Sequence, residues 1–413
     1  MKSSKKLSLV HGVQRLAYLL LLSACLLACS SEENGTMPGT PLSFTTLVYM
    51  MADNSMDSQV DYAVGQLKQG MKSKDVGNTV VYLDRQDASP RLFRISRQGE
   101  EIPLKDYPEE NSAKAETLVR VIGETKQLVP ADHFGLVLWG HATGWLPGGY
   151  SHDIMQVSVP SRQNLNTRYM GLDGTPNEAT TSPLMEIDAL AKSLPDHVAD
   201  YIWFDACLMA NVETFYQLRH KCQYLIGSPT VVLAEAQYDV SGIPYAKVLP
   251  FLFGGKDALV QACKTYYQHY EGKKYSNMRS ATITLVDASK MDALYQHVNV
   301  LLKDRLSCVE TMDTRTLQAY HRDNDPHVFF DLADMVHQSA DRATSAFDKA
   351  LSDAVLYRAA TDKFLDQLTL VPGHCCGLSV YVPLKQWNAT KEYQYYFREM
   401  EWSNVYGNFT GQS

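Results

Sequence analysis

The chain has 413 residues, a formal net charge of −8 and a hydrophobic content of 45%. This composition is sufficient for a full core and excludes a largely disordered chain. The acidic balance argues against nucleic acid as a partner and against electrostatic docking on anionic lipid.

The first 29 residues predict an export signal. Basic residues precede the apolar stretch Leu16–Ala28, which is too short for a spanning helix. The stretch ends in Leu-Leu-Ala-Cys29, which resembles a bacterial lipobox, so we expect residues 1–29 to be a signal peptide and Cys29 the lipidated first residue. Cys25 also fits the pattern, and an ordinary cleaved signal peptide is a further alternative. The polar run after Cys29 resembles the export signals of Bacteroides-type surface lipoproteins, and residues 30–43 read as a flexible tether.

Strands and helices then alternate along the chain. This order predicts an α/β fold with a mostly parallel sheet and helices on both faces. Strands are expected at Thr45–Met50, Thr79–Leu83, Leu92–Ile95, Leu136–Trp139, Tyr201–Phe204 and Tyr224–Gly227. Helices are expected at Asp57–Lys72, Ala113–Leu128, Leu184–Leu194 and Leu208–His220.

The C-terminal half continues the mixture of helices and strands. We place a catalytic core at residues 44–240 and a C-terminal subdomain, packed on that core, at residues 241–413. Helices are expected at Phe251–Tyr270, Ser289–Asp304 and Arg342–Leu356, and strands or short elements at Ala281–Val286, Val328–Asp331 and Gly377–Val382.

Two of the predicted strands end in reactive residues, His141 and Cys207. Both strands are continuously apolar, as expected for strands buried on both faces of a parallel sheet. Ligands of open α/β sheets bind beyond the carboxyl ends of such strands. Taken singly, each residue reads as a buried thiol or a satisfied core imidazole. Together, at two strand ends, they predict a thiolate nucleophile and its proton acceptor.

Neighbouring residues would complete this chemistry. Because Cys207 is predicted to start a helix, we expect the helix dipole to favour its thiolate. The backbone N–H groups of Cys207 and Ala142 are the expected donors to an oxyanion. Asp205 lies two residues before Cys207, so strand alternation can point both side chains the same way. It is either the floor of a pocket for a basic side chain or the cap of the following helix.

Several motifs of the chain resemble the clostripain family (C11) of cysteine peptidases, which belongs to the caspase-like clan. They are TLVYMMADN from Thr46, WGHATGW from Trp139, FDACLMANVE from Phe204, FDLAD from Phe330 and GLSVYVP from Gly377. The resemblance implies a caspase-like α/β/α sandwich with a C-terminal extension, a Cys–His dyad and cleavage after Arg or Lys. It also assigns Asp205 to the P1 pocket. One departure is Ala142, where the family usually has Gly, which would be strained if that position needs a positive φ.

Other residues complete the expected site. Trp145 is a candidate for the wall of the substrate cleft. Glu235 and Asp239 are further candidate acids for the P1 pocket, with an exposed loop acid as the alternative for both. The polar insertion from Gly148 to Ser182 contains Arg162 and Arg168, where some relatives cut themselves, so we expect either self-cleavage or an uncut surface loop.

No cofactor is expected to be required. The eight cysteines show no repeated CxxC spacing, which argues against zinc. Asp53, Asp57 and Asp61 could suggest calcium, although a solvated helix face with a capping Asp explains them more simply. In His374-Cys375-Cys376 we expect buried thiols, and in the aromatic C-terminal tail we expect packing.

The motifs together predict a monomeric lipoprotein endopeptidase at the outer membrane or cell surface, with the periplasm as an alternative. Its partners would be protein or peptide substrates with Arg or Lys at P1, and only its N-terminal lipid would contact a membrane. A transpeptidase or other amidase using the same dyad is one alternative. A non-catalytic binding lipoprotein on the same scaffold is another.

Overall fold

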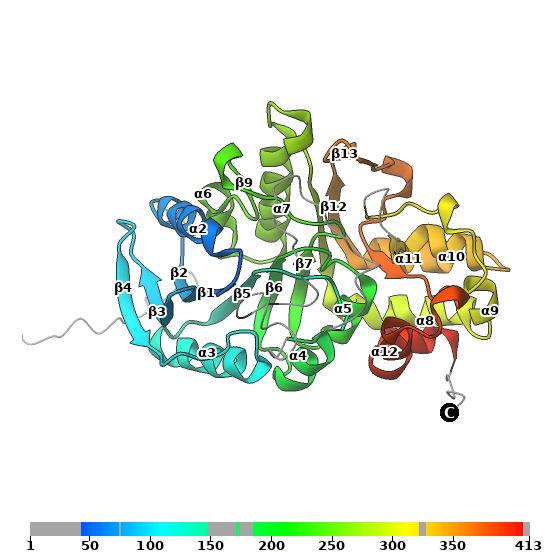
Figure 1. The fold of residues 1–413 in the computed structure, drawn as a ribbon, viewed down its shortest axis with the longest axis horizontal. Coiled ribbons are helices and arrows are strands. Elements are labelled where there is room, and N and C mark those ends of the chain that lie inside the picture. Colours follow the sequence, from blue (N-terminus) through cyan, green and yellow to red (C-terminus); the bar gives the residue numbers. More distant parts are fainter. Residues whose placement is uncertain are drawn as a thin grey trace, which may run out of the picture. The chain divides into compact units, whose positions relative to one another are not determined.

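A nine-stranded sheet lies at the centre of the computed structural model, which describes residues 43–73, 76–147, 171, 173, 185–321 and 328–407. The strand order is β12-β10-β7-β6-β5-β1-β2-β3-β4 (Figure 1). The middle strands β7, β6, β5, β1 and β2 run parallel, and antiparallel pairing adds two strands at each edge. The bounds are β1 Phe44–Ala52, β2 Asn78–Arg85, β3 Ala88–Ile95, β4 Glu101–Asp106, β5 His133–Trp139, β6 Ala199–Asp205, β7 Cys222–Gly227, β10 Thr282–Asp287 and β12 Val355–Ala360.

Helices cover both faces of this sheet because successive strand side chains point to opposite sides. In β1, Leu47 and Tyr49 belong to one hydrophobic core, whereas Val48 and Met50 belong to the other. Figure 1 shows α2, α6 and α7 on one face and α3, α4 and α5 on the opposite face. Their bounds are α2 Asp57–Gly70, α3 Ala115–Leu128, α4 Ile187–Ser193, α5 Val212–Gln217, α6 Tyr245–Val248 and α7 Lys256–Glu271. The predicted α/β/α sandwich with a mostly parallel central sheet is confirmed.

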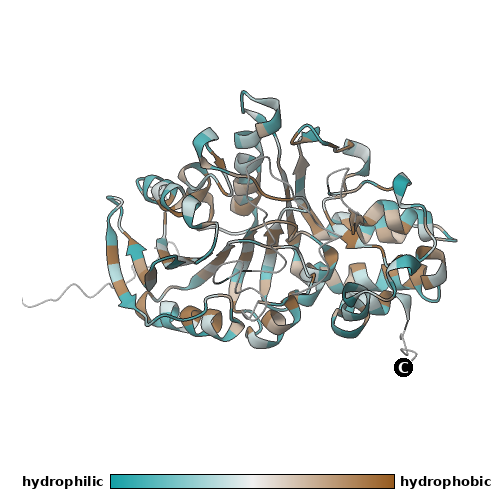
Figure 2. Ribbon diagram, viewed as in Figure 1, coloured by the Kyte–Doolittle hydropathy of each residue, from teal (hydrophilic) through white to brown (hydrophobic). Residues whose placement is uncertain are grey.

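The C-terminal half both extends the sheet and adds a layer of its own. β10 and β12 come from this half, so the main sheet continues past residue 240, and the boundary placed there stays a prediction. Figure 2 shows brown apolar residues in the central strands and teal polar residues on the outer helix faces. The remaining elements are α8 Met291–Leu302, α9 Leu306–Val309, α10 Leu332–Ser339, α11 Ser345–Ala354, α12 Lys391–Glu399, the pair β11 Phe329–Asp331 and β15 Ser379–Tyr381, and the pair β13 Lys363–Phe364 and β14 Leu368–Thr369.

Two differences from the sequence prediction concern the strands of the main sheet. The edge strand β4 was not expected, because its charged and proline-containing sequence EIPLKD is only partly buried. The helix predicted at Arg342–Leu356 ends earlier, at Ala354, and the chain continues directly as β12. β-branched and aromatic residues in VLYRAA favour the strand there. Among the residues that the structure describes, none lies in a helix with the length and apolarity that crossing a membrane requires.

Candidate active site

His141 and Cys207 follow neighbouring parallel strands. Trp139 of β5 is paired with Asp205 of β6, and each reactive residue lies two positions beyond that pair. Adjacent strands are about 4.8 Å apart, so the parallel register alone brings the imidazole and the thiol to the same stretch of the sheet edge. The carboxyl ends of β1 and β7 border the same edge, and both contribute residues to the site.

Cys207 lies in a loop, and the expectation that it starts a helix is wrong. Helix α5 begins five residues later, at Val212. The side chain of Asn211 accepts a hydrogen bond from the Thr214 N–H at 2.7 Å and caps the helix. Leu208 has a left-handed φ of 61°, a conformation that interrupts a helix before it can form. The helix dipole is therefore not available to activate the thiol.

The loop that contains Cys207 is instead hydrogen-bonded to the segment that follows β7. Leu208 N–H donates to the Thr230 carbonyl at 2.9 Å, and Ala210 N–H donates to the Ser228 carbonyl at 3.0 Å. From the same segment, the Val232 N–H points at Cys207 Sγ at 3.2 Å. An N–H group donating to sulfur favours the thiolate over the thiol. This contact can supply part of the activation that the sequence assigned to a helix.

His141 is a buried imidazole held from two sides. Its Nε2 lies 2.8 Å from Ser55 Oγ, in the turn after β1. Its carbonyl accepts a hydrogen bond from Gly171 N–H at 2.8 Å. Burial lowers the pKa of His141 to about 4, so the ring is neutral at neutral pH. A neutral imidazole can accept the proton of a thiol, whereas an imidazolium cannot.

Asp205 is a buried carboxylate beside the reactive loop. It accepts hydrogen bonds from the Ile243 N–H at 3.0 Å and from the Tyr245 hydroxyl at 2.8 Å. Burial raises the pKa of Asp205 to about 7. Within the described part of the chain, no basic side chain forms an ion pair with it. The capping alternative does not fit the structure, since Asn211 caps α5.

Gly242 fits closely against the Asp205 carboxylate. Its φ is +59°, and a Cβ at this position would lie 2.3 Å from Asp205 Oδ1. Gly242 N–H donates to the Leu233 carbonyl at 3.0 Å, which closes the small hairpin β8 (Ala234–Glu235) and β9 (Val240–Ser241). The hairpin therefore links Val232, which contacts Cys207, to Gly242 and Ile243, which contact Asp205.

The two further acids of this hairpin differ in their surroundings. Glu235 is half-buried in β8 and accepts a hydrogen bond from Gln237 Nε2 at 2.5 Å. Asp239 is already engaged, because Lys273 forms an ion pair with it at 2.8 Å and the Tyr62 hydroxyl donates to it at 2.5 Å. Of the two, Glu235 is the acid that lacks an ion-pair partner among the described residues.

Trp145 lies in the core, which corrects the expectation that it lines the cleft. Only 1% of the residue is exposed. Its ring packs edge-on against Tyr381 at 5.2 Å and lies 5.3 Å from Tyr396 of α12. The sequence placed Trp145 near His141 but could not show that the aromatic tail folds back onto it.

Ala142 is tolerated where the family usually has Gly. It is absent from the residues with a left-handed φ, so the alanine side chain causes no strain there. Its N–H donates to no acceptor among the described residues, and it follows His141 directly. The group remains a candidate donor to an oxyanion.

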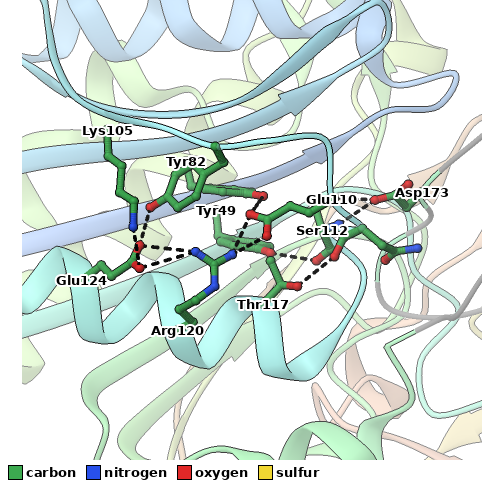
Figure 3. A network of polar contacts seen from close by, with 11 residues as sticks. Tyr49, Tyr82, Lys105, Glu110, Ser112, Thr117, Arg120, Glu124 and Asp173 are labelled. Carbon is green, nitrogen blue, oxygen red and sulfur yellow. Dashed lines mark hydrogen bonds and ion pairs between the residues drawn. The ribbon is translucent and has the colours of Figure 1, made fainter.

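Within the insertion after the His141 motif, the structure describes residues 171 and 173, and both are hydrogen-bonded to the scaffold. Asp173 accepts a hydrogen bond from the Ser112 N–H at 2.5 Å. Figure 3 shows the network that holds this region, in which Arg120 pairs with Glu110 and the Tyr49 hydroxyl donates to the Ser112 carbonyl at 2.8 Å. The candidate cleavage residues Arg162 and Arg168 lie outside the described residues, as does Cys29.

The weaker sequence motifs have structural partners. Arg85 pairs with Asp57 at 2.9 Å and with Asp61 at 3.1 Å, so these carboxylates fix the start of α2 to the end of β2. His374 bonds Asp334 at 2.8 Å. Cys375 and Cys376 are buried. Within the described residues, no group of three or more His, Cys, Asp or Glu side chains is arranged to hold a metal ion.

Two residues that contact the proposed dyad were not found from the sequence. Ser55 reaches His141 from the turn after β1, and Val232 reaches Cys207 from the segment after β7. The available signal was topological, because both residues follow strands whose carboxyl ends border the same edge. A sequence pattern identifies the turn but not the direction of its side chains.

The mostly parallel sheet between two layers of helices defines the class of caspase-like α/β proteins. The clostripain family model matches residues 48–407, so the chain belongs to the clostripain family, and it is a cysteine peptidase by that membership. No curated protein sequence matches the chain.

Solved structures of C11 proteases are similar over most of their length. An inactive zymogen C11 protease from Parabacteroides distasonis is 28% identical, with a TM-score of 0.72 over 89% of this chain and 99% of the other. A secreted C11 cysteine protease from Bacteroides thetaiotaomicron, in complex with an irreversible peptide inhibitor, is 25% identical, with a TM-score of 0.70 over 88% of this chain and 98% of the other. A second structure of a secreted C11 cysteine protease from that organism, at 22% identity and a TM-score of 0.67, supports the fold alone.

Proposed function

We propose that Cys207 and His141 form the catalytic dyad of an endopeptidase that cleaves after Arg or Lys. The observation that carries the proposal is the β5–β6 register, which sets both residues two positions beyond one strand pair. The neutral state of His141 and the N–H contact to Cys207 Sγ support it.

The proposed reaction moves one proton and one acyl group. His141 takes the Cys207 thiol proton, and Sγ attacks the peptide carbonyl carbon. The resulting oxyanion would receive the N–H groups of Ala142 and Cys207. As the C–N bond breaks, His141 gives its proton to the leaving amine and a thioester remains. Water then hydrolyses the thioester, which returns the thiol.

Asp205 is the proposed partner of the P1 side chain. Its carboxylate is buried without a cation among the described residues, and a carboxylate can accept about four hydrogen bonds. A substrate guanidinium or ammonium would supply the missing charge and restore a low carboxyl pKa. Glu235, on the adjacent hairpin, would lie at the outer part of the same pocket. The lack of a side chain at Gly242 allows its loop to lie directly against the Asp205 carboxylate.

We further propose that the chain is exported as a lipoprotein through Cys29 and that it cuts itself after Arg162 or Arg168. The export proposal follows from the N-terminal sequence, and one similar protease is described as secreted. Gly171, three residues after Arg168 within the insertion, donates a hydrogen bond to the His141 carbonyl, so this point of the insertion lies beside the proposed dyad.

The test uses a soluble form starting at Ser30 and two matched fluorogenic peptides, one with Arg and one with Asp at P1. The proposal predicts cleavage of the Arg peptide only, and loss of that cleavage in Cys207→Ala. Equal cleavage of both peptides would contradict the proposed pocket for a basic P1 side chain. Cleavage that survives in Cys207→Ala would contradict the proposed dyad. Ligated products in the presence of an added amine would favour the transpeptidase alternative.

A further inference from the structure

We infer that Ser55 is a positioning residue that holds His141 through Nε2 and stabilises its protonated form. This inference rests on the proposed dyad and adds a third residue to it. Ser55 Oγ lies 2.8 Å from His141 Nε2, and no other hydrogen bond of the His141 ring is formed with a described residue.

The turn that carries Ser55 is held by hydrogen bonds on both sides. Asn54 is fully buried and donates from Nδ2 to the Met51 carbonyl at 3.0 Å. The Asn54 side-chain oxygen accepts a hydrogen bond from the Met56 N–H at 2.8 Å. Beyond the turn, the Asp57 carboxylate pairs with Arg85 through two hydrogen bonds, which fixes the start of α2. The hydroxyl of Ser55 is therefore held in place between two anchored residues.

The tautomer follows from the chemistry of a neutral imidazole, which has one nitrogen that donates and one that accepts. When Ser55 Oγ accepts from Nε2–H, the lone pair is on Nδ1, which is then the nitrogen that can receive a thiol proton. When Ser55 donates to Nε2 instead, Nδ1 carries a hydrogen and cannot act as a base. The proposed proton transfer therefore requires the first arrangement.

The same contact favours the state after proton transfer. The imidazolium carries hydrogens on both nitrogens, and its Nε2–H donates to Ser55 Oγ with a charge-assisted bond. Burial opposes this charged ring, since it lowers the pKa of His141 to about 4. The hydroxyl compensates part of that cost at the moment when the thiolate forms, without itself exchanging a proton with substrate.

The test compares Ser55→Ala with Ser55→Thr, which keeps a hydroxyl. The matched control is Ser58→Ala, because Ser58 is three residues away and its Oγ donates to the Ser55 carbonyl and accepts from Gln59 Nε2, each at 3.2 Å, without contacting His141. The readouts are the pH profile of Cys207 alkylation by iodoacetamide and, separately, kcat and KM on an Arg peptide. Thermal unfolding of each variant reports whether the turn is intact.

We expect Ser55→Ala to slow alkylation at neutral pH and to lower kcat by roughly 10- to 100-fold, the range for a hydrogen bond to a charged group, with little change in KM. We expect Ser55→Thr to recover most of the rate and Ser58→Ala to match the parent. A Ser55→Ala variant that alkylates and turns over like the parent overturns the inference, as does a Ser55→Thr variant as slow as Ser55→Ala. Alkylation needs no peptide substrate, so a parent protein without peptidase activity would reject the proposed function and still leave Ser55 tested.

Discussion

Asp205→Asn is expected to make the protein more stable and less active at the same time. A pKa of about 7 for the folded carboxyl, against 3.8 for an ordinary Asp, means that ionising Asp205 costs about 4 kcal/mol more in the folded state than in the unfolded state. The asparagine removes this cost and keeps one oxygen for the Ile243 N–H or the Tyr245 hydroxyl. One lost hydrogen bond offsets about 1 kcal/mol of the gain.

Burial of Asp205 makes the folded protein less stable as pH rises. Because the folded pKa is raised, the folded chain binds more protons than the unfolded chain between pH 3.8 and about 7, so this group lowers parent stability as pH rises through that window. The asparagine variant lacks that loss. We therefore expect the stability difference between Asp205→Asn and the parent to grow by about 2–3 kcal/mol from pH 5 to pH 8.

Urea unfolding at the two pH values measures the stability difference, and kcat/KM on an Arg peptide measures the function. Loss of the charged partner is expected to reduce kcat/KM by about 100-fold, within the range for breaking a buried charge pair. In the parent, KM for the Arg peptide should rise below pH 7 as Asp205 takes up a proton. Asp257→Asn, an exposed acid in the first turn of α7, is the control. An Asp205→Asn variant whose stability difference does not change with pH would refute the burial argument, and unchanged Arg cleavage would refute the pocket.

Three further predictions concern other parts of the molecule. Trp145→Ala should lose about 3–5 kcal/mol of stability by urea unfolding while keeping its preference for Arg over Asp at P1, and a changed preference with intact stability would return Trp145 to the cleft. Gly242→Ala should reduce kcat/KM on the Arg peptide by at least about tenfold, since its Cβ would clash with Asp205 and its φ is left-handed; parent-like kinetics would show that the loop does not border the pocket. Replacing both Arg162 and Arg168 by Ala should leave one intact band on a denaturing gel after incubation, and continued fragmentation of the purified chain would place the cut elsewhere.

The sequence predicted the sheet and the dyad because both depend on strand ends. Continuous apolar runs identify buried parallel strands, and the residue after each run marks the sheet edge. His141 and Cys207 could therefore be found from the chain alone. The register that pairs Trp139 with Asp205 was not visible in the sequence, but any parallel pairing of the two strands would bring their ends together.

The errors arise where tertiary contacts override local preference. Residues 208–220 have a helical composition. However, the Leu208 N–H donates a hydrogen bond to the Thr230 carbonyl, and the helix begins only after its cap, Asn211. Trp145 has the position of a cleft residue, yet a tail more than 200 residues away buries it. Ser55 was overlooked because a serine in a turn has many roles, and only the fold shows that His141 is its partner.

The most direct test of the dyad is to locate an active-site label. A soluble form of the parent, its Cys207→Ala variant and its His141→Ala variant would each be treated with a peptide acyloxymethyl ketone carrying Arg, then digested and analysed by mass spectrometry. The account predicts one adduct on Cys207 in the parent, none in Cys207→Ala and a strongly slowed reaction in His141→Ala. An adduct on another cysteine, or labelling of Cys207 at the same rate without His141, would contradict it.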